Sequence, residues 1–423
     1  MNSNDVQTLL QQGRLDEAER AARQLLQLQP RDIESMNVLA LIALRRGQLA
    51  LAQQGLEASL RVNPEHALTH HYLGRVHDAA GNVDAAVAEH GAAIELAPEM
   101  FVVRLHYAAA LERAGQIEQA SIHYFRATQD AQAKGRWVNQ ETTAPALRPM
   151  VEHAVQVVRS TRKATFANLL EPLRQQYGAS SLQRIEQCLR IYFLEESPVY
   201  PDPRQRPTFL YFPGLPPAAY LDRSLFPWIE QLEAQTDAIR EELLRLLPSE
   251  AGRERVFTSE AVEQVNLRGL NTPPSWNGYY FYRHGIRRED NCSSCPVTAQ
   301  TLELLPLSHV REHGPEVLFS VFTAGTHLLP HRGVTNTRLV GHLPLIVPPD
   351  CALNVGGEIH EWREGRAVIF DDTYEHEAWN RSQQTRVVLI FDLWNPHLTE
   401  AERAAIAQLV PAMGDFRQAA EAA

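Results

Sequence analysis

The sequence has few cysteines, no excess of positive charge and no long hydrophobic run. Four cysteines in 423 residues are too few for a disulfide scaffold. Lysine and arginine total 40 against 51 acidic residues, and a net charge of −11 without a basic patch disfavours a nucleic-acid-binding surface. The longest strongly apolar runs, such as Val387–Phe391, are far too short to cross a bilayer, and the initial MNSNDVQTLL shows no secretory leader. We therefore expect a soluble, cytoplasmic protein with no nucleic-acid partner and no transmembrane segment.

The composition is otherwise that of a folded protein. Apolar residues make up 44% of the chain and charged residues 22%, which argues against wholesale disorder. A length of 423 residues suits two or three domains.

The first third of the chain repeats itself every 34 residues. Three positions keep this spacing: Gly13, Gly47, Gly81 and Gly115; Ala18, Ala52, Ala86 and Ala120; and Pro30, Pro64 and Pro98. Glycine permits a turn between two helices, alanine lets the helices approach, and proline ends the second helix. The pattern resembles tetratricopeptide repeats, which implies a solenoid of helix pairs over residues 1–130. Its groove would bind a protein or peptide partner, or the repeats would be a scaffold or a homo-oligomer surface, and the sequence leaves both open.

The chain changes character twice after the repeats. Residues 131–197 keep a helical pattern without a repeat, so we expect them to extend or cap the solenoid. Prolines then crowd together at 198, 201, 203 and 207, which predicts an extended linker over residues 198–208. Residues 209–423 are predicted to form a second domain that opens with a helix near residues 226–247.

After Tyr279 the sequence favours short strands separated by turns. The candidate strands are YYFYRHG, VLFSVF, RLVGHLPLIVP, LNV and EIHEW around a Gly-Gly turn, GRAVIF, EHEAWN and RVVLIFDLW. Short antiparallel strands at this spacing predict a sandwich or barrel of jelly-roll type, and hence an α+β multidomain chain.

Two of these strands carry charge among apolar residues. Period-two alternation puts Arg338, Val340 and His342 on one face of their strand. The same rule puts Arg386 and Val388 together on one face of the strand that contains them. If these faces are internal, each arginine needs an anionic partner, either a side chain or a ligand carboxylate.

Two histidines are candidate metal ligands. His331 and His376 lie 45 residues apart on or beside different candidate strands, each near one of these arginines. Two imidazoles beside a buried cation suit non-haem iron with a dicarboxylate cosubstrate. The usual iron triad adds a carboxylate two residues after the first histidine, where this chain has Gly333, so spacing alone leaves the site open.

The motifs around these residues resemble a known family. HRGVTNTRLVGHLPLIVP, EGRAVIFDDTYEHEAWNRS and RVVLIFDLWNPHLT are similar to the aspartyl/asparaginyl β-hydroxylases, over about Tyr211 to Arg403. The resemblance implies a double-stranded β-helix that uses Fe(II), 2-oxoglutarate and O₂. It also implies two protein ligands only, with glycine at position 333, and tetratricopeptide-like repeats before the catalytic domain.

The resemblance also assigns expected roles, residue by residue. His331 and His376 match the iron ligands, and Arg386 matches the residue that pairs with the distal carboxylate of 2-oxoglutarate. The other matching positions are Ser320 and His342 for the cosubstrate and Arg338 and, loosely, His284 for the substrate. The family's second substrate-contacting arginine is replaced here by Val340, which puts recognition of an acidic substrate in doubt.

The implied activity is hydroxylation of the β-carbon of Asp or Asn in a protein or peptide. Two alternatives stay open: a small-molecule, carrier-bound or lipid substrate, and a repeat adaptor without catalysis.

Other polar motifs have simpler interpretations. We interpret Asp371 and Asp372 as turn residues rather than metal ligands, and Cys292 and Cys295 as free thiols in a loop, because no second cysteine pair completes a zinc site. Most of the aromatic residues Trp276, Tyr279, Tyr280 and Tyr282 are expected to pack in the core.

Overall fold

The computed structural model describes residues 2–249, 252–256, 266–268 and 275–423. The chain divides into two compact units: Met1–Phe166 with Gly414–Ala423, and Ala167–Met413. These units are structural; the domain boundaries expected above rest on sequence and stay a prediction. None of the helices in the described ranges is long and apolar enough to span a membrane.

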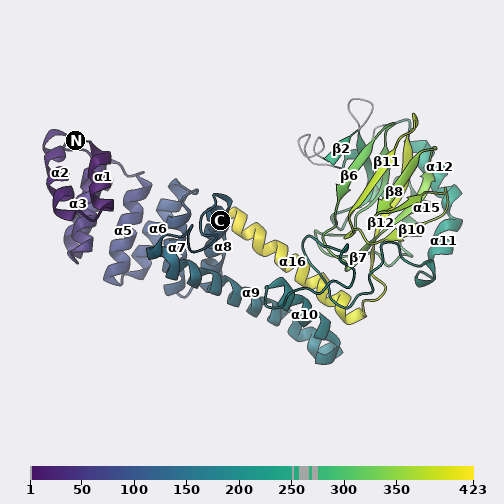
Figure 1. The fold of residues 1–423 in the computed structure, drawn as a ribbon, viewed down its shortest axis with the longest axis horizontal. Helices are drawn as coiled ribbons and strands as arrows, with labels where there is room; N and C mark the ends of the chain where they lie inside the picture. Colours follow the sequence, from purple (N-terminus) through teal and green to yellow (C-terminus); the bar gives the residue numbers. More distant parts are fainter. Residues whose placement is uncertain (1, 250–251, 257–265, 269–274) are drawn as a thin grey trace. The chain divides into compact units, whose positions relative to one another are not determined.

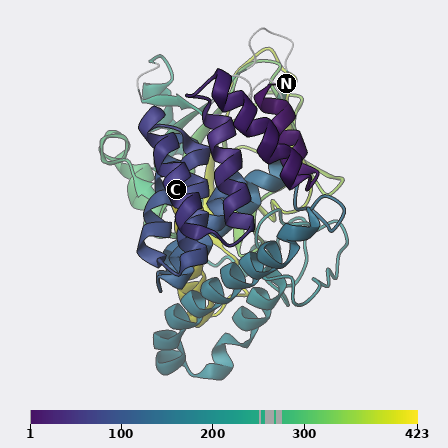
Figure 2. The same cartoon turned by 90° about the vertical axis from the view of Figure 1, so that its left-hand side faces the viewer.

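The first unit is a series of helix pairs, and its helices lie side by side in two views (Figures 1 and 2). The helices are α1 (Ser3–Gln11), α2 (Leu15–Leu28), α3 (Ile33–Arg45), α4 (Leu49–Val62), α5 (Ala67–Ala80), α6 (Val83–Leu96), α7 (Phe101–Arg113) and α8 (Ile117–Ala133). They are followed by η1 (Pro145–Leu147) and α9 (Arg148–Tyr177).

The three repeated positions have the roles expected of them. Gly13, Gly47, Gly81 and Gly115 have φ values of 75°, 73°, 77° and 78°, which glycine adopts without the strain that a Cβ would cause. Ala18, Ala52, Ala86 and Ala120 are completely buried between helices. The three prolines each follow a helix end by two residues. The predicted repeats are therefore confirmed.

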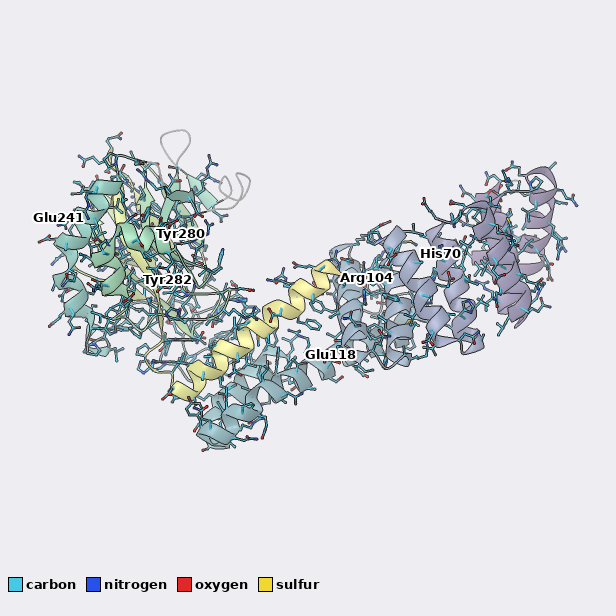
Figure 3. All side chains as sticks on the ribbon, turned by 180° about the vertical axis from the view of Figure 1, so that it is seen from behind. His70, Arg104, Glu118, Glu241, Tyr280 and Tyr282 are labelled. Carbon is cyan, nitrogen blue, oxygen red and sulfur yellow. The ribbon has the colours of Figure 1, made fainter. Side chains whose placement is uncertain are left out.

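The helical unit also buries polar side chains. Arg104, labelled in Figure 3, is 1% exposed, and its guanidinium donates a 2.9 Å hydrogen bond to the carbonyl of Pro98. The imidazoles of His71 and His90 lie in contact, with 3.2 Å between their Nδ1 atoms.

The second unit contains short helices and two antiparallel sheets. Its helices are η2 (Ala179–Leu182), α10 (Gln183–Tyr192), η3 (Arg223–Leu225), α11 (Ile229–Ala234), α12 (Thr236–Leu246), α14 (Glu289–Ser294) and α15 (Pro296–Leu302). A last helix, α16 (Glu400–Ala422), begins in this unit, and its residues from Gly414 onward belong to the first unit. The helix expected at residues 226–247 is thus two helices with a break at Gln235. In the proline-rich stretch, Gln205 is buried and donates a 2.6 Å hydrogen bond to Asp371.

Within the described residues, the larger sheet has the order β1-β3-β5-β12-β7-β10, with β4 paired to β3, and the smaller has the order β2-β6-β11-β8-β9. The strands are β1 (Arg253–Arg255), β2 (Leu267–Arg268), β3 (Trp276–Arg283), β4 (Ile286–Arg287), β5 (Val317–Phe322), β6 (His327–His331), β7 (Arg338–Ile346), β8 (Cys351–Val355), β9 (Glu358–Glu361), β10 (Val368–Phe370), β11 (His376–Asn380) and β12 (Arg386–Trp394). From β5 to β8, successive strands alternate between the sheets, which is the connectivity of a jelly roll, or double-stranded β-helix. The predicted fold class is confirmed.

Alternation along the central strands separates two apolar cores. Leu343 of β7 and Leu389 of β12 pack with α11, α12, α14 and α15 on the outer face of the larger sheet. Val340 and Val388 face the other way and pack with Leu353 of the smaller sheet. The polar residues that share this inner face with Val340 and Val388 therefore point between the sheets.

Candidate active site

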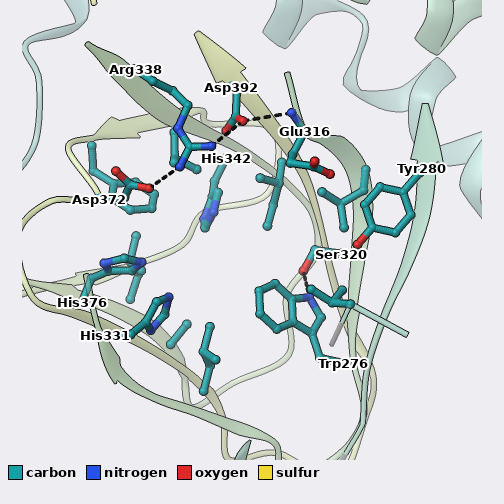
Figure 4. A pocket seen from close by; sticks show the side chains of 18 of the residues that line it. Trp276, Tyr280, Glu316, Ser320, His331, Arg338, His342, Asp372, His376 and Asp392 are labelled. Carbon is teal, nitrogen blue, oxygen red and sulfur yellow. Dashed lines mark hydrogen bonds and ion pairs between the residues drawn. The ribbon is translucent and has the colours of Figure 1, made fainter. Parts of the chain in front are cut away.

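A cavity of about 450 Å³ opens between the two sheets. All of the predicted site residues line it: Ser320, His331, Arg338, His342, His376, Arg386 and, at the rim, His284. Figure 4 shows several of them around a common space. Strand pairing therefore brings together residues that are up to 102 positions apart in the chain.

The two histidines sit opposite each other on neighbouring strands. His331 ends β6, His376 begins β11, and the two residues are in register with 4.1 Å between their ring centroids. The Nδ1 atom of His331 lies 2.9 Å from the carbonyl of Leu329, and that of His376 lies 3.1 Å from the carbonyl of Tyr374. A carbonyl only accepts, so each Nδ1 carries the proton and each Nε2 keeps its lone pair.

The environment keeps His376 neutral. Burial lowers the pKa of His376 to about 3, and the nearby His331 ring adds to the effect. A neutral imidazole with a free Nε2 is the form that binds a metal ion. Among the described residues, no set of three or more His, Cys, Asp or Glu side chains is arranged to hold a metal, so this pair is the candidate donor set.

Asp372 occupies the space beside Gly333. A Cβ added to Gly333 would lie 2.1 Å from Oδ1 of Asp372, and the N–H of Gly333 donates a 2.6 Å hydrogen bond to the carbonyl of Asp372. Only glycine fits at 333 with this neighbour in place. Asp372 is 5% exposed, and no described residue hydrogen-bonds to its Oδ1.

The two adjacent aspartates therefore differ in role. Asp371 makes turn contacts, accepting from the N–H and hydroxyl of Thr373 at 2.9 and 2.6 Å, as the turn interpretation expects. Asp372 lines the cavity, which that interpretation missed. The one sequence feature that could have indicated this position of Asp372 is the absence of a side chain at Gly333.

Arg386 is a buried cation with no anionic partner in the part of the chain that the structure describes. Its side chain is 1% exposed, and no carboxylate within the described ranges pairs with it. Its guanidinium lies 4.2 Å from the Phe322 ring centroid and 4.3 Å from that of Trp362, and its Nη1 lies 3.2 Å from the hydroxyl of Ser320. Burial lowers the pKa of Arg386 to about 9, and its Nε finds no hydrogen-bond partner among the described residues.

Ser320 and His342 border this cation. The Ser320 hydroxyl also accepts a 2.9 Å hydrogen bond from the indole of Trp276. His342 is 4% exposed, and burial together with the nearby Arg386 keeps its pKa well below the usual range, so it is a neutral polar group. Trp276 and Tyr280 line the cavity, whereas Tyr279 packs in the outer core as expected.

Arg338, unlike Arg386, has two anionic partners. Its Nη1 lies 2.8 Å from Asp392 and its Nη2 lies 2.8 Å from Asp372. Burial acts against the charge of Arg338, but the two carboxylates outweigh it and raise the arginine's pKa. The sequence predicted a substrate contact for Arg338 and did not anticipate Asp392 as its partner.

Cys292 and Cys295 are buried in the outer core, away from the cavity, and both are free thiols, as predicted. The predicted loop is wrong, because Cys292 lies in α14 and Cys295 joins α14 to α15.

Comparisons with known proteins agree with this fold and geometry. The family model for aspartyl/asparaginyl beta-hydroxylase matches residues 233–396. Aspartate beta-hydroxylase domain-containing protein 2 of Mus musculus is 31% identical over 56% of this chain and 68% of its own length. The chain belongs to the aspartyl/asparaginyl β-hydroxylase family.

Relatives within the family have different names and lengths. The ornithine lipid ester-linked acyl 2-hydroxylase of Rhizobium tropici is 35% identical over 43% of this chain, and the match spans 62% of the relative. The human aspartyl/asparaginyl beta-hydroxylase is 33% identical over 42% of this chain, and the match spans 22% of the relative. The chain thus covers less than two thirds of both.

Proposed function

We propose that the protein is an Fe(II)- and 2-oxoglutarate-dependent dioxygenase that hydroxylates its substrate. One observation carries the proposal: the buried guanidinium of Arg386, which has no carboxylate partner among the described residues, lines the same cavity as two histidines that each place Nδ1 on a backbone carbonyl and so present Nε2 for a metal. An unpaired buried charge costs several kcal/mol, so a site with this arrangement suits a ligand carboxylate.

The residues fit the cofactors that the family implies. His331 and His376 would hold Fe(II), and Arg386 with Ser320 would bind the distal carboxylate of 2-oxoglutarate through the planar fork of the guanidinium. When bound, iron(II) with 2-oxoglutarate and O₂ would supply an oxidant for an unactivated C–H bond, leaving succinate and CO₂. The chain itself would position these groups in the cavity between the two sheets.

The family description supports the substrate predicted from sequence, the β-carbon of Asp or Asn in a protein or peptide. The helical repeats would recruit such a substrate or mediate homo-oligomerisation. A lipid acyl chain is the second candidate. It is supported by the Rhizobium relative and by a cavity wall that is mostly apolar.

A metal-binding measurement tests the site. His376→Ala should abolish Co(II) binding by the purified protein, followed by absorbance, and Fe(II)-dependent succinate formation. His360→Ala is the matched control, because His360 lies on β9 and does not line the cavity. Metal binding or succinate formation by a folded His376→Ala variant at the wild-type level would refute the assignment. A wild-type protein that binds neither metal nor 2-oxoglutarate would support the repeat adaptor without catalysis.

A further inference from the structure

The guanidinium of Arg338 is engaged on both terminal nitrogens. Asp392, from the same inner face of β12 as Arg386, binds Nη1 at 2.8 Å, and Asp372 binds Nη2 at 2.8 Å. Asp392 is 2% exposed and Asp372 is 5% exposed. Figure 4 shows both ion pairs at the edge of the cavity. Arg338 is therefore already compensated before any ligand enters.

Asp392 is held in place independently of Arg338. Its Oδ2 also accepts a 2.9 Å hydrogen bond from the N–H of Glu316. The Glu316 carboxylate accepts from the N–H of His284 at 2.6 Å and lines the cavity. The other nearby cation, Arg283, is paired with Glu254.

Around Arg338 the cavity thus carries three carboxylates; Tyr280, Arg283, His284 and His313 also line it. Asp372, Asp392 and Glu316 face one compensated arginine there. The surrounding wall is formed by Leu318, Leu328, Val334, Val340, Leu353 and Ile390. Among the described residues, the two arginines that line this part of the cavity, Arg338 and Arg283, already have carboxylate partners, and Val340 supplies no further cation. A carboxylate placed there would therefore meet like charges.

We propose that Asp392 is a specificity-determining residue: by saturating Arg338 it excludes carboxylate groups from the substrate end of the cavity and admits uncharged aliphatic ones. The inference rests on the proposed function, since it concerns the substrate of that same site. Of the substrates considered under the proposed function, it disfavours Asp and favours Asn or an acyl chain, and it leaves Arg386 as the anion-binding residue of the cavity.

The test uses two probes that differ in charge, hexanamide and hexanoate. Binding to the full-length protein is measured by calorimetry without O₂, with Mn(II) and saturating 2-oxoglutarate present so that Arg386 is occupied. The wild type should bind hexanamide at least tenfold more tightly than hexanoate. Asp392→Asn keeps the side-chain size and an acceptor for the N–H of Glu316, and should improve hexanoate binding at least tenfold with little change for hexanamide. The double variant Asp392→Asn/Arg338→Met should lose this gain.

The outcomes separate this inference from the proposed function. Three results would overturn the inference about Asp392. The wild type could bind both probes equally, or it could fail to bind hexanamide. The third result is a gain in hexanoate binding that persists in the double variant. A misfolded Asp392→Asn protein, seen as a lost melting transition, leaves the wild-type comparison as the deciding measurement. Succinate formation with Fe(II) is assayed separately, so its absence alongside the expected probe preference would overturn only the proposed function.

Discussion

Replacing Arg386 with methionine should separate a ligand-binding cation from a structural one. The fall in the pKa of Arg386 from 12.5 to about 9 on burial corresponds to about 5 kcal/mol against the charged form. A ligand carboxylate would recover part of this energy, and losing one partner of such a buried pair costs about 2–5 kcal/mol. Arg386→Met should therefore weaken 2-oxoglutarate binding by about 30-fold to several thousand-fold.

Without ligand, we expect the same substitution to leave the stability of the protein unchanged or to increase it. Methionine keeps the apolar packing against Phe322 and Trp362 but removes an uncompensated charge, so the free energy of unfolding should stay equal or rise. We expect 2-oxoglutarate with Mn(II) at 100 times its Kd to stabilise the wild type by about 2.7 kcal/mol and the variant hardly at all.

Chemical denaturation with and without ligand measures both effects. Arg366→Met is the control, because Arg366 is more than half exposed and lies outside the cavity; it should keep the full ligand-induced stabilisation. A ligand-free Arg386→Met protein that is several kcal/mol less stable, yet still stabilised by 2-oxoglutarate, would show that the guanidinium is structural and refute the reasoning.

The helical unit gives two further predictions. Gly74→Ala should destabilise the protein by about 1–3 kcal/mol, because its Cβ would lie 2.7 Å from the His90 ring. Gly91→Ala is the matched control: its Cβ would lie 3.5 Å from Tyr107, so urea unfolding should show no loss and up to about 1 kcal/mol of gain. Burial lowers the pKa of His71 to about 2 and that of His123 to about 4, so both stay neutral when folded and take up a proton on unfolding below about pH 6.5. The free energy of unfolding should therefore decrease as the pH is lowered, by about 2 kcal/mol per histidine between pH 7 and pH 5. Variants with glutamine at these positions should lose less stability over the same range. Equal pH dependence in the wild type and the variants would contradict this.

Local patterns were sufficient to predict much of the architecture. The turn at Gly47 needs a positive φ and the contact at Ala52 needs a small side chain, and these requirements recur every 34 residues because each repeat meets the same neighbours. The two faces of β7 were likewise predictable, because strand side chains alternate whatever the surrounding fold. The residues of the candidate site were indicated by family resemblance, since spacing alone left His331 and His376 ambiguous.

The partners of these side chains were decided only by tertiary structure. Asp372 has the sequence signature of a turn residue, yet packing of its loop against Gly333 and β7 places its carboxylate in the cavity and on Arg338. Asp392 reaches the same guanidinium because β12 pairs with β7, across 54 residues of chain. The sequence therefore pointed to two arginines on these strands but did not distinguish Arg338, which has two carboxylate partners, from Arg386, which has none among the described residues. That distinction depends on which strands pair and in which register, and pairing between distant segments leaves no periodic signal in the chain.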